Sequence, residues 1–174
     1  MKTAFFTGHR TINLTKVKPQ FTEMIREAYV NEGVDHFITG MAIGSDLLAA
    51  KILTEMGFPW TAALPCPPEQ QCALWHSWEQ KQYWRMLNSA PNVVLVSPEY
   101  SKECFHLRNL WMAKESELCL AVYNNLPKGG TANTIRLCKK REIPVIALNP
   151  NSLKVTRSPI QIQLSLKLDI NISL

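Results

Sequence analysis

The sequence lacks any stretch that would place the protein in a membrane or export it. No apolar run approaches the roughly 20 residues that a membrane-spanning helix needs, and the apolar run in the N-terminal MKTAFFTGHR is far too short for the core of a signal peptide. No low-complexity linker and no internal repeat interrupts the 174 residues. Because 46% of the residues are hydrophobic and 19% are charged, the composition also excludes a disordered chain. We therefore expect a soluble, cytoplasmic, globular protein that makes no membrane contact.

The cysteines lack the spacing that disulfide frameworks and metal sites show. There are five of them, no two are arranged as CxxC, and nothing suggests export, so reduced thiols are the simplest interpretation. The cysteines and histidines nearest to one another match no standard zinc spacing: Cys66, Cys72, His76, Cys104 and His106. We predict neither a bound metal nor a resident cofactor.

Short apolar, β-rich runs alternate with helix-like stretches along most of the chain. The predicted strands are Thr3–Phe6, His36–Thr39, Trp60–Leu64, Val93–Val96, Leu118–Tyr123 and Pro144–Leu148. The predicted helices lie near residues 17–32, 45–57, 70–90, 105–116 and 131–142. Continuous apolar strands are typical of a parallel sheet buried on both faces. We therefore predict an α/β fold: a doubly wound, Rossmann-like, mostly parallel sheet with helices on both faces.

The C-terminal segment follows a different pattern. From Ile160 to Leu174 every second residue is Ile or Leu and the intervening residues are polar, which predicts a long amphipathic strand. We expect an extra C-terminal edge strand that pairs with its own sheet or with a second copy of the chain, and hence a homo-oligomer. The division that follows is a Rossmann-like domain over residues 1–149 and an extension over 150–174. Within the stretch 70–90, Trp75 and Trp78 are expected to share a helix face in the core.

The loop after the second predicted strand reads TGMAIGSD. Gly40 allows a sharp turn off the strand, and Gly44 allows backbone N–H groups to approach a ligand at the start of a helix. Ser45 or Asp46 could cap that helix, and Asp46 could hold a ribose hydroxyl. A tight turn followed by an ordinary cap explains the same residues equally well.

The stretch YNNLPKGGTANTIR follows the fifth predicted strand. Gly129 and Gly130 precede Thr131, Asn133 and Thr134, so hydrogen-bonding side chains gather where a helix begins. The Lys and Ser/Thr of a Walker loop are absent after the last glycine, which argues against metal-dependent triphosphate chemistry. The alternative is an ordinary capped helix.

Cationic and donor side chains lie near the same predicted edge of the sheet. Thr7-Gly8-His9-Arg10 ends the first strand, and Arg108 lies on the helix after the fourth. These side chains could approach an anion beyond the carboxyl ends of the strands, where ligands bind in such sheets. Alternatively Arg10 is a solvated surface residue, and Arg108 pairs with a surface carboxylate.

Taken in order, TGHR, GMAIGSDLLAA, LRNLWM and YNNLPKGGTANTIR resemble the SLOG superfamily, and in particular its YpsA-like branch of small bacterial and phage proteins. The resemblance covers about residues 1–149. The superfamily includes the DprA/SMF DNA-uptake proteins and the LOG phosphoribohydrolases. The resemblance implies a Rossmann-like sheet whose glycine-rich loops hold a nucleotide or a nucleotide-derived small molecule. The residues expected to contact it are Gly8, His9, Arg10, Gly40, Met41, Gly44, Ser45, Asp46, Arg108, Asn109, Gly129, Gly130, Thr131, Asn133 and Thr134.

Three functions follow as hypotheses, and whether the protein is an enzyme stays open. The first is binding, as a sensor or a sequestering protein. The second is LOG-like cleavage or transfer at the N-glycosidic bond of a nucleoside monophosphate: Arg108 and Met112 match the LOG motif R-K-x-x-M, with Asn109 in place of Lys. No carboxylate stands where LOG enzymes have their catalytic Glu, so Asp46 and Glu115 are the substitutes to consider. The third, DprA-like binding of single-stranded nucleic acid, suits the net charge of +5 but ranks last, because no basic stripe interleaved with aromatic residues is present.

Overall fold

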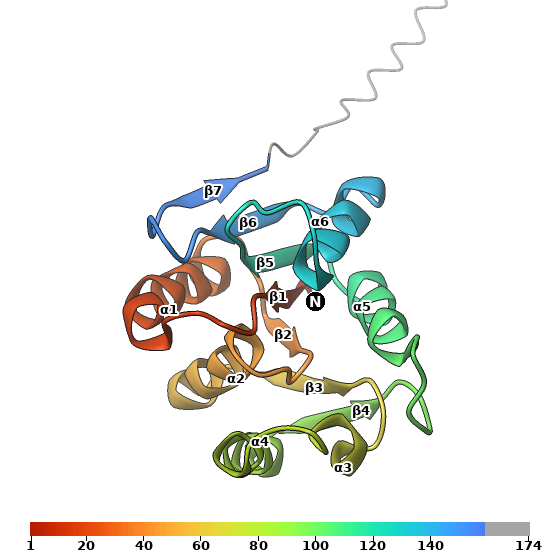
Figure 1. The fold of residues 1–174 in the computed structure, drawn as a ribbon. Coiled ribbons are helices and arrows are strands. Elements are labelled where there is room, and N and C mark those ends of the chain that lie inside the picture. Colours follow the sequence, from red (N-terminus) through yellow and green to blue (C-terminus); the bar gives the residue numbers. More distant parts are fainter. Residues whose placement is uncertain (159–174) are drawn as a thin grey trace, which may run out of the picture.

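The strands form one sheet whose order places β1 at its centre. This computed structural model describes residues 1–158, and the fold below refers to those residues. The strands are β1 (Thr3–Gly8), β2 (His36–Thr39), β3 (Trp60–Leu64), β4 (Asn92–Leu95), β5 (Leu118–Val122), β6 (Val145–Leu148) and β7 (Val155–Arg157). They lie in the order β4-β3-β2-β1-β5-β6-β7, and all pair in parallel except β7, which is antiparallel to β6 (Figure 1). The chain therefore winds outward on one side of β1, then returns to its other side as β5, which makes β1/β5 the topological switch point.

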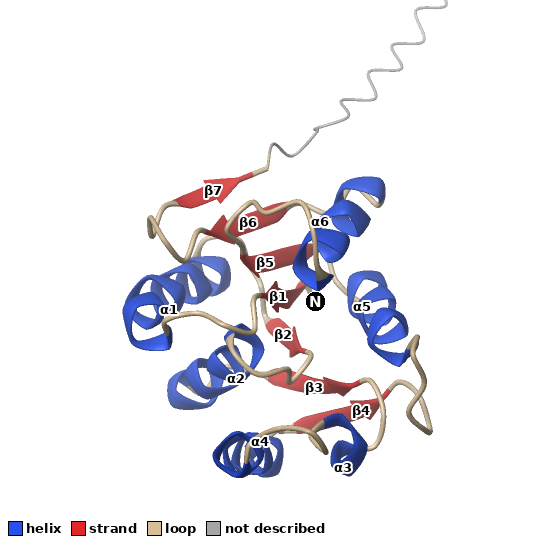
Figure 2. Ribbon diagram, viewed as in Figure 1, coloured by secondary structure: helices blue, strands red, loops and turns tan. Residues whose placement is uncertain are grey.

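Helices cover both faces of the sheet, as predicted. The helices α1 (Leu14–Val30), α2 (Ser45–Met56) and α4 (Ser77–Ser89) lie on one face, and α5 (Cys104–Lys114) and α6 (Gly130–Lys140) lie on the other (Figure 2). Adjacent residues of β1 supply the two cores: Phe6 packs on the α1 side, edge to face with Phe21, whereas Phe5 packs on the α5 side with Met112. A strand buried on both faces must be apolar at consecutive positions. The predicted α/β fold is confirmed.

The stretch 70–90, expected to be one helix, is two. The short helix α3 (Pro68–Gln71) ends before Cys72, and α4 begins after His76, where the His76 N–H donates to the Glu79 carboxylate at 2.9 Å in a capping box. The expectation that Trp75 and Trp78 share a helix face is therefore wrong. Trp75 lies in the turn between the helices and packs against Tyr83, whereas Trp78 lies on α4 and is 57% exposed.

The extra C-terminal edge strand is present, but it is formed by residues upstream of the alternating run. β7 continues the sheet beyond β6, and Arg157 at its end forms ion pairs with Glu27 and Glu32, the first on α1 and the second just after it. The alternating run of residues 160–174 and the long strand predicted for it lie outside the described residues. Within residues 1–158 no helix is both long enough and apolar enough to cross a membrane.

Candidate functional site

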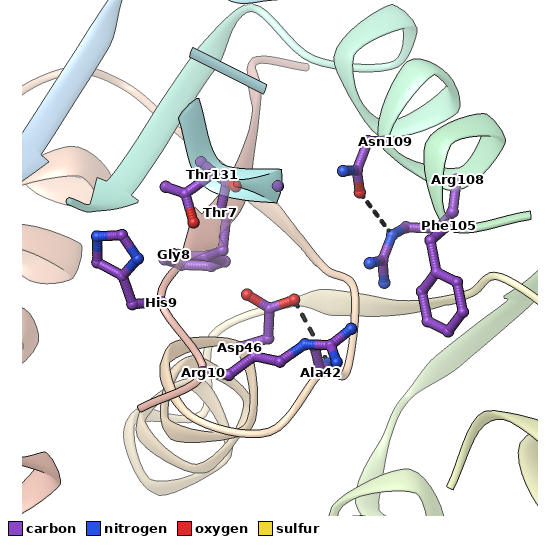
Figure 3. Close-up of a pocket in the computed structure, with 12 residues that line it drawn as sticks. Thr7, Gly8, His9, Arg10, Ala42, Asp46, Phe105, Arg108, Asn109 and Thr131 are labelled. Atoms are coloured by element: carbon purple, nitrogen blue, oxygen red, sulfur yellow. Dashed lines mark hydrogen bonds between the residues drawn. The ribbon is translucent and has the colours of Figure 1, made fainter. Parts of the chain in front are cut away.

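The loops after β1, β2 and β5 surround a polar cavity at the carboxyl edge of the sheet. Its volume is about 270 Å³, and it lies beside the β1/β5 switch point (Figure 3). The structure brings eight of the residues expected at the site into its lining: Gly8, His9, Arg10, Asp46, Arg108, Asn109, Gly130 and Thr131. The cavity also faces the first turn of α6.

Arg108 is the buried cation of this cavity. It projects from α5 and is 5% exposed, so its guanidinium has little contact with solvent. Its Nε donates to the Asn109 side-chain oxygen at 2.8 Å, and its Nη1 donates to the main-chain oxygens of Gly40 and, at 3.5 Å, Ala63. These bonds fix the orientation of the guanidinium toward the cavity rather than toward a surface carboxylate, which was the alternative expected from the sequence.

Asp46 places a buried carboxyl group opposite Arg108. It is 5% exposed and lies in the first turn of α2. Burial raises the pKa of this carboxyl to about 6, and the Arg108 guanidinium, the N–H of Ala42 and the Arg10 guanidinium oppose the rise. Burial likewise lowers the pKa of the Arg108 guanidinium, against the favourable charge of Asp46. The cavity therefore holds a carboxyl group that exchanges its proton near neutral pH beside a cation.

A chain of hydrogen bonds ties the Arg108 helix to the start of α6. The Asn109 amide donates to the Thr134 hydroxyl at 3.1 Å, and that hydroxyl donates to the main-chain oxygen of Gly130 at 3.1 Å. Gly129 precedes α6 with a φ of +99°, and no side chain caps this helix. Unpaired N–H groups at a helix start favour anions, so the α6 turn presents such groups beside the cavity.

The β1–α1 loop is held by contacts with its two neighbours. The Ser45 N–H donates to the main-chain oxygen of His9 at 3.3 Å, and the His9 Nε2 lies 2.7 Å from the Asn124 side-chain oxygen, after β5. The Arg10 guanidinium carbon lies 5.8 Å from the centre of the Phe105 ring on α5. Strand-end loops that are distant in the sequence thus support one another.

Several residues expected to contact a ligand support the loops instead of lining the cavity. Gly40 has no room for a Cβ, which would overlap the Arg108 guanidinium and lie 2.9 Å from the Asp46 carboxylate. Gly44 has a φ of +86° and lies against the main-chain oxygens of His9 and Arg10. Met41, Ser45 and Thr134 are likewise buried without lining the cavity, whereas Gly129 is exposed and also lies outside the lining.

Two expected residues lie away from the cavity. The Asn133 side chain is exposed and accepts a hydrogen bond from Arg136. Glu115 follows the last residue of α5, 43% exposed beside Lys114, whereas the cavity lies near the opposite end of that helix. Glu115 is thus no candidate for chemistry in this cavity, and Asp46 is the carboxyl group that lines it.

Sequence reasoning missed two kinds of residue. Phe105 lines the cavity outside every quoted motif, and Ala42 lies within TGMAIGSD but was not among the residues expected to contact a ligand. Gln71 is buried and donates to the main-chain oxygens of Gly40 and Met41 at 3.2 Å, while its own side-chain oxygen accepts from the Tyr83 hydroxyl at 3.0 Å. This clamp on the β2–α2 loop comes from α3 and α4, and only the fold brings it there. Within residues 1–158 no cluster of three or more His, Cys, Asp or Glu side chains could hold a metal.

A central parallel sheet with helices on both faces and a cavity at its switch point defines a Rossmann-like α/β protein. Comparison with protein families makes the assignment specific: the chain belongs to the YspA SLOG family, whose model matches residues 4–148. The resemblance to the SLOG superfamily is thereby confirmed.

Two curated relatives are similar over most of their length. The SPbeta prophage-derived protein YoqJ of Bacillus subtilis (strain 168) is 29% identical over 142 residues, which cover 73% of this chain and 82% of YoqJ. The UPF0398 protein BH1768 of Halalkalibacterium halodurans is 24% identical over 140 residues, covering 78% of this chain and 74% of BH1768.

Solved structures share the fold at low identity. DNA processing protein A from Helicobacter pylori, which has a single-stranded DNA binding mode, superposes with a TM-score of 0.64 at 18% identity, covering 85% of this chain and 65% of that one. The same protein from Streptococcus pneumoniae gives 0.64 at 13% identity, and TM1055 gives 0.55 at 15%. These matches cover 86% and 83% of this chain, 50% of the S. pneumoniae chain and 72% of TM1055. This chain therefore matches only about half to two thirds of the DNA processing proteins.

Proposed function

We propose that the protein binds a nucleotide or a nucleotide-derived small molecule in the cavity at the β1/β5 switch point. The observation that carries the proposal is the opposition of buried Arg108 and buried Asp46 in one cavity beside the first turn of α6. A phosphate suits Arg108, Arg10 and the α6 N–H groups. The Asp46 carboxyl group suits a ribose hydroxyl, which can donate to it.

The pairing of donors with a buried acceptor favours a nucleotide over inorganic phosphate. A site for phosphate alone gains nothing from a carboxylate, which repels it, whereas a sugar phosphate satisfies both groups. The likeness to DNA processing protein A makes single-stranded nucleic acid the competing partner. Such binding depends on an exposed basic path with stacking surfaces, and it weakens steeply with salt.

The test is isothermal titration of the purified protein with AMP, GMP, CMP and UMP, and separately with a dT oligonucleotide at low and high salt. Gly130→Val is the blocking variant, because Gly130 lines the cavity and a Cβ there meets nothing within 4 Å, so a valine side chain fits without disturbing the fold and should take up space that a ligand needs. Asn133→Val is the matched control: it adds the same residue to the same helix turn outside the cavity.

The expected result is binding of at least one nucleotide by the wild type and by Asn133→Val, with a loss of about tenfold or more in Gly130→Val. Equal affinity in a folded Gly130→Val protein would refute this cavity as the site. Binding of the oligonucleotide alone, weakened by salt, would favour the nucleic-acid function instead.

A second candidate function is cleavage of the N-glycosidic bond of a nucleoside monophosphate. It is favoured by the position of Asp46, because a carboxyl group with a pKa of about 6 inside a cavity can donate a proton to a leaving base. The assay is chromatography of AMP incubated with the protein. Free adenine released by the wild type but not by Asp46→Asn would support this activity. If the wild type binds AMP and leaves it intact, the protein binds the nucleotide without cleaving it.

A further inference from the structure

A second and larger cavity lies beside the first, as a groove along the outer side of α2. Its volume is about 960 Å³. The helices α1 and α4, which lie on either side of α2 in Figure 1, contribute side chains to its lining. Apolar side chains form much of its lining, among them Ile43, Leu47 and Met86. Leu14 and Trp78, both exposed, stand at the first turns of α1 and α4, toward the carboxyl edge of the sheet.

Arg10 is the residue that lines both cavities. Its guanidinium lies over the Phe105 ring at the small cavity, while the residues that follow it, Thr11 and Ile12, line the groove. Gly44, packed against the main-chain oxygen of Arg10, also lines the groove. A ligand that occupied both cavities would pass this cation, so the part that joins its two halves should be anionic.

The other charges along the groove are only partly paired. The Lys18 and Lys51 ammonium groups lie 2.9 Å and 3.9 Å from the Glu55 carboxylate. Glu55 is thus shared by two ammonium groups, and Arg85 lines the groove without an ion pair among residues 1–158, so what distinguishes Arg10 is its place between the two cavities. The two compartments with a cation between them match a molecule with two uncharged rings and a charged linker.

Resting on the proposed function, we infer that the ligand class is a dinucleotide: one nucleoside phosphate lies in the small cavity, the linking phosphates lie at Arg10, and the second base lies in the groove against Trp78. The exposed indole offers a flat surface on which a base can stack. The groove also offers the Gln82 amide and the Thr54 hydroxyl, which can bond to the edge of a base but have no use for an acyl chain.

The experiment compares ligands that differ in the second half. AMP, NAD⁺, diadenosine diphosphate and coenzyme A are titrated into the wild type, Trp78→Ala and Leu74→Ala. Leu74 is 99% exposed, lies in the turn before α4 and does not line the groove, so Leu74→Ala controls for the loss of an exposed apolar side chain. Because Trp78 is half exposed, its replacement leaves the core intact, which thermal unfolding checks.

At least one dinucleotide should bind the wild type about tenfold or more tightly than AMP. Trp78→Ala should abolish that gain and leave the AMP affinity unchanged, and Leu74→Ala should keep it. Equal binding of AMP and both dinucleotides would overturn the dinucleotide assignment while leaving the proposed function standing. The assignment would also be overturned if only coenzyme A bound more tightly than AMP, or if the tighter binding of a dinucleotide survived Trp78→Ala. Failure of every ligand in this set would overturn the dinucleotide assignment, and the proposed function falls with it only if GMP, CMP and UMP also fail to bind in the first test.

Discussion

Gly40→Ala should destabilise the protein through Arg108, although the substitution adds a single methyl group at the end of a strand. The new Cβ would overlap the Arg108 guanidinium and approach the Asp46 carboxylate to 2.9 Å, closer than Cβ atoms normally come to a neighbour. Arg108 is held by main-chain oxygens and by Asn109, so it cannot move aside without losing those hydrogen bonds.

The expected magnitude follows from these contacts. Loss of a charge-assisted hydrogen bond costs about 1.5–3 kcal/mol, and overpacking a buried position costs a similar amount. We expect the free energy of unfolding to fall by about 3 kcal/mol, which lowers the midpoint of thermal unfolding by roughly 10 °C for a chain of this size. Nucleotide binding should fail with it, because the displaced guanidinium no longer faces the cavity.

Urea unfolding followed by circular dichroism measures the change, with Gly130→Ala as the matched control. Its Cβ meets no atom within 4 Å, and alanine is the better helix former, so its stability should equal or exceed that of the wild type. If Gly40→Ala is as stable as the wild type, or if both variants lose stability equally, the tight packing of Arg108 on Gly40 is not what maintains the site.

Four further outcomes are expected. The raised pKa of Asp46 means that the folded protein holds this proton more tightly than the unfolded chain does. Its ionisation should therefore lower the free energy of unfolding by up to about 3 kcal/mol as pH rises from about 4 to about 6. Urea unfolding at a series of pH values measures this change, and Asp46→Asn should remove it. The affinity for inorganic phosphate should fall over the pH range in which Asp46 ionises, because the carboxylate repels the anion. If Asp46→Asn shows the same fall, Asp46 is not the group responsible. Tyr83→Phe should cost about 1–3 kcal/mol by leaving the Gln71 side-chain oxygen unpaired, whereas Tyr29→Phe, at an exposed position, should be close to neutral in the same unfolding assay. Arg108→Lys keeps the charge but loses the forked donors, so nucleotide affinity measured by calorimetry should drop about tenfold or more; undiminished affinity would show that the bonded geometry of Arg108 is irrelevant to binding.

The alternation of apolar runs with helix-like stretches predicted the order of the elements because a strand buried on both faces must be apolar throughout. The prediction is wrong within residues 70–90, where a local capping signal outweighs the apolar pattern. Between Cys72 and His76 the chain leaves one helix and starts another, and the capping box that decides this uses only two side chains, His76 and Glu79. A pattern that counts apolar residues does not register such a cap, so it predicts one helix where the structure has two.

The residues of the candidate site could likewise be predicted from the sequence only in part. Arg10, Asp46, Arg108, Asn109 and the glycines could be marked from the sequence because they cluster at predicted strand ends and helix starts. The sequence could not separate the residues that line the cavity from those that support its loops, because Gly40 and Gly130 are the same residue type in similar glycine-containing loops. One is packed against a guanidinium and the other faces open space, and this difference exists only after the chain has folded.

The sequence by itself determined the order of the strands and of most helices, the parallel sheet and the edge at which functional residues would gather, because periodicity and strand polarity are local properties of the chain. Only the tertiary structure decided which carboxyl group meets Arg108. Glu115 is seven residues from Arg108 in the sequence and Asp46 is on another helix. Yet Asp46 lines the cavity, because the start of α2, after β2, and the first half of α5 lie at the same carboxyl edge of the sheet. Burial between these elements then raises the pKa of that carboxyl, a property that no residue has on its own.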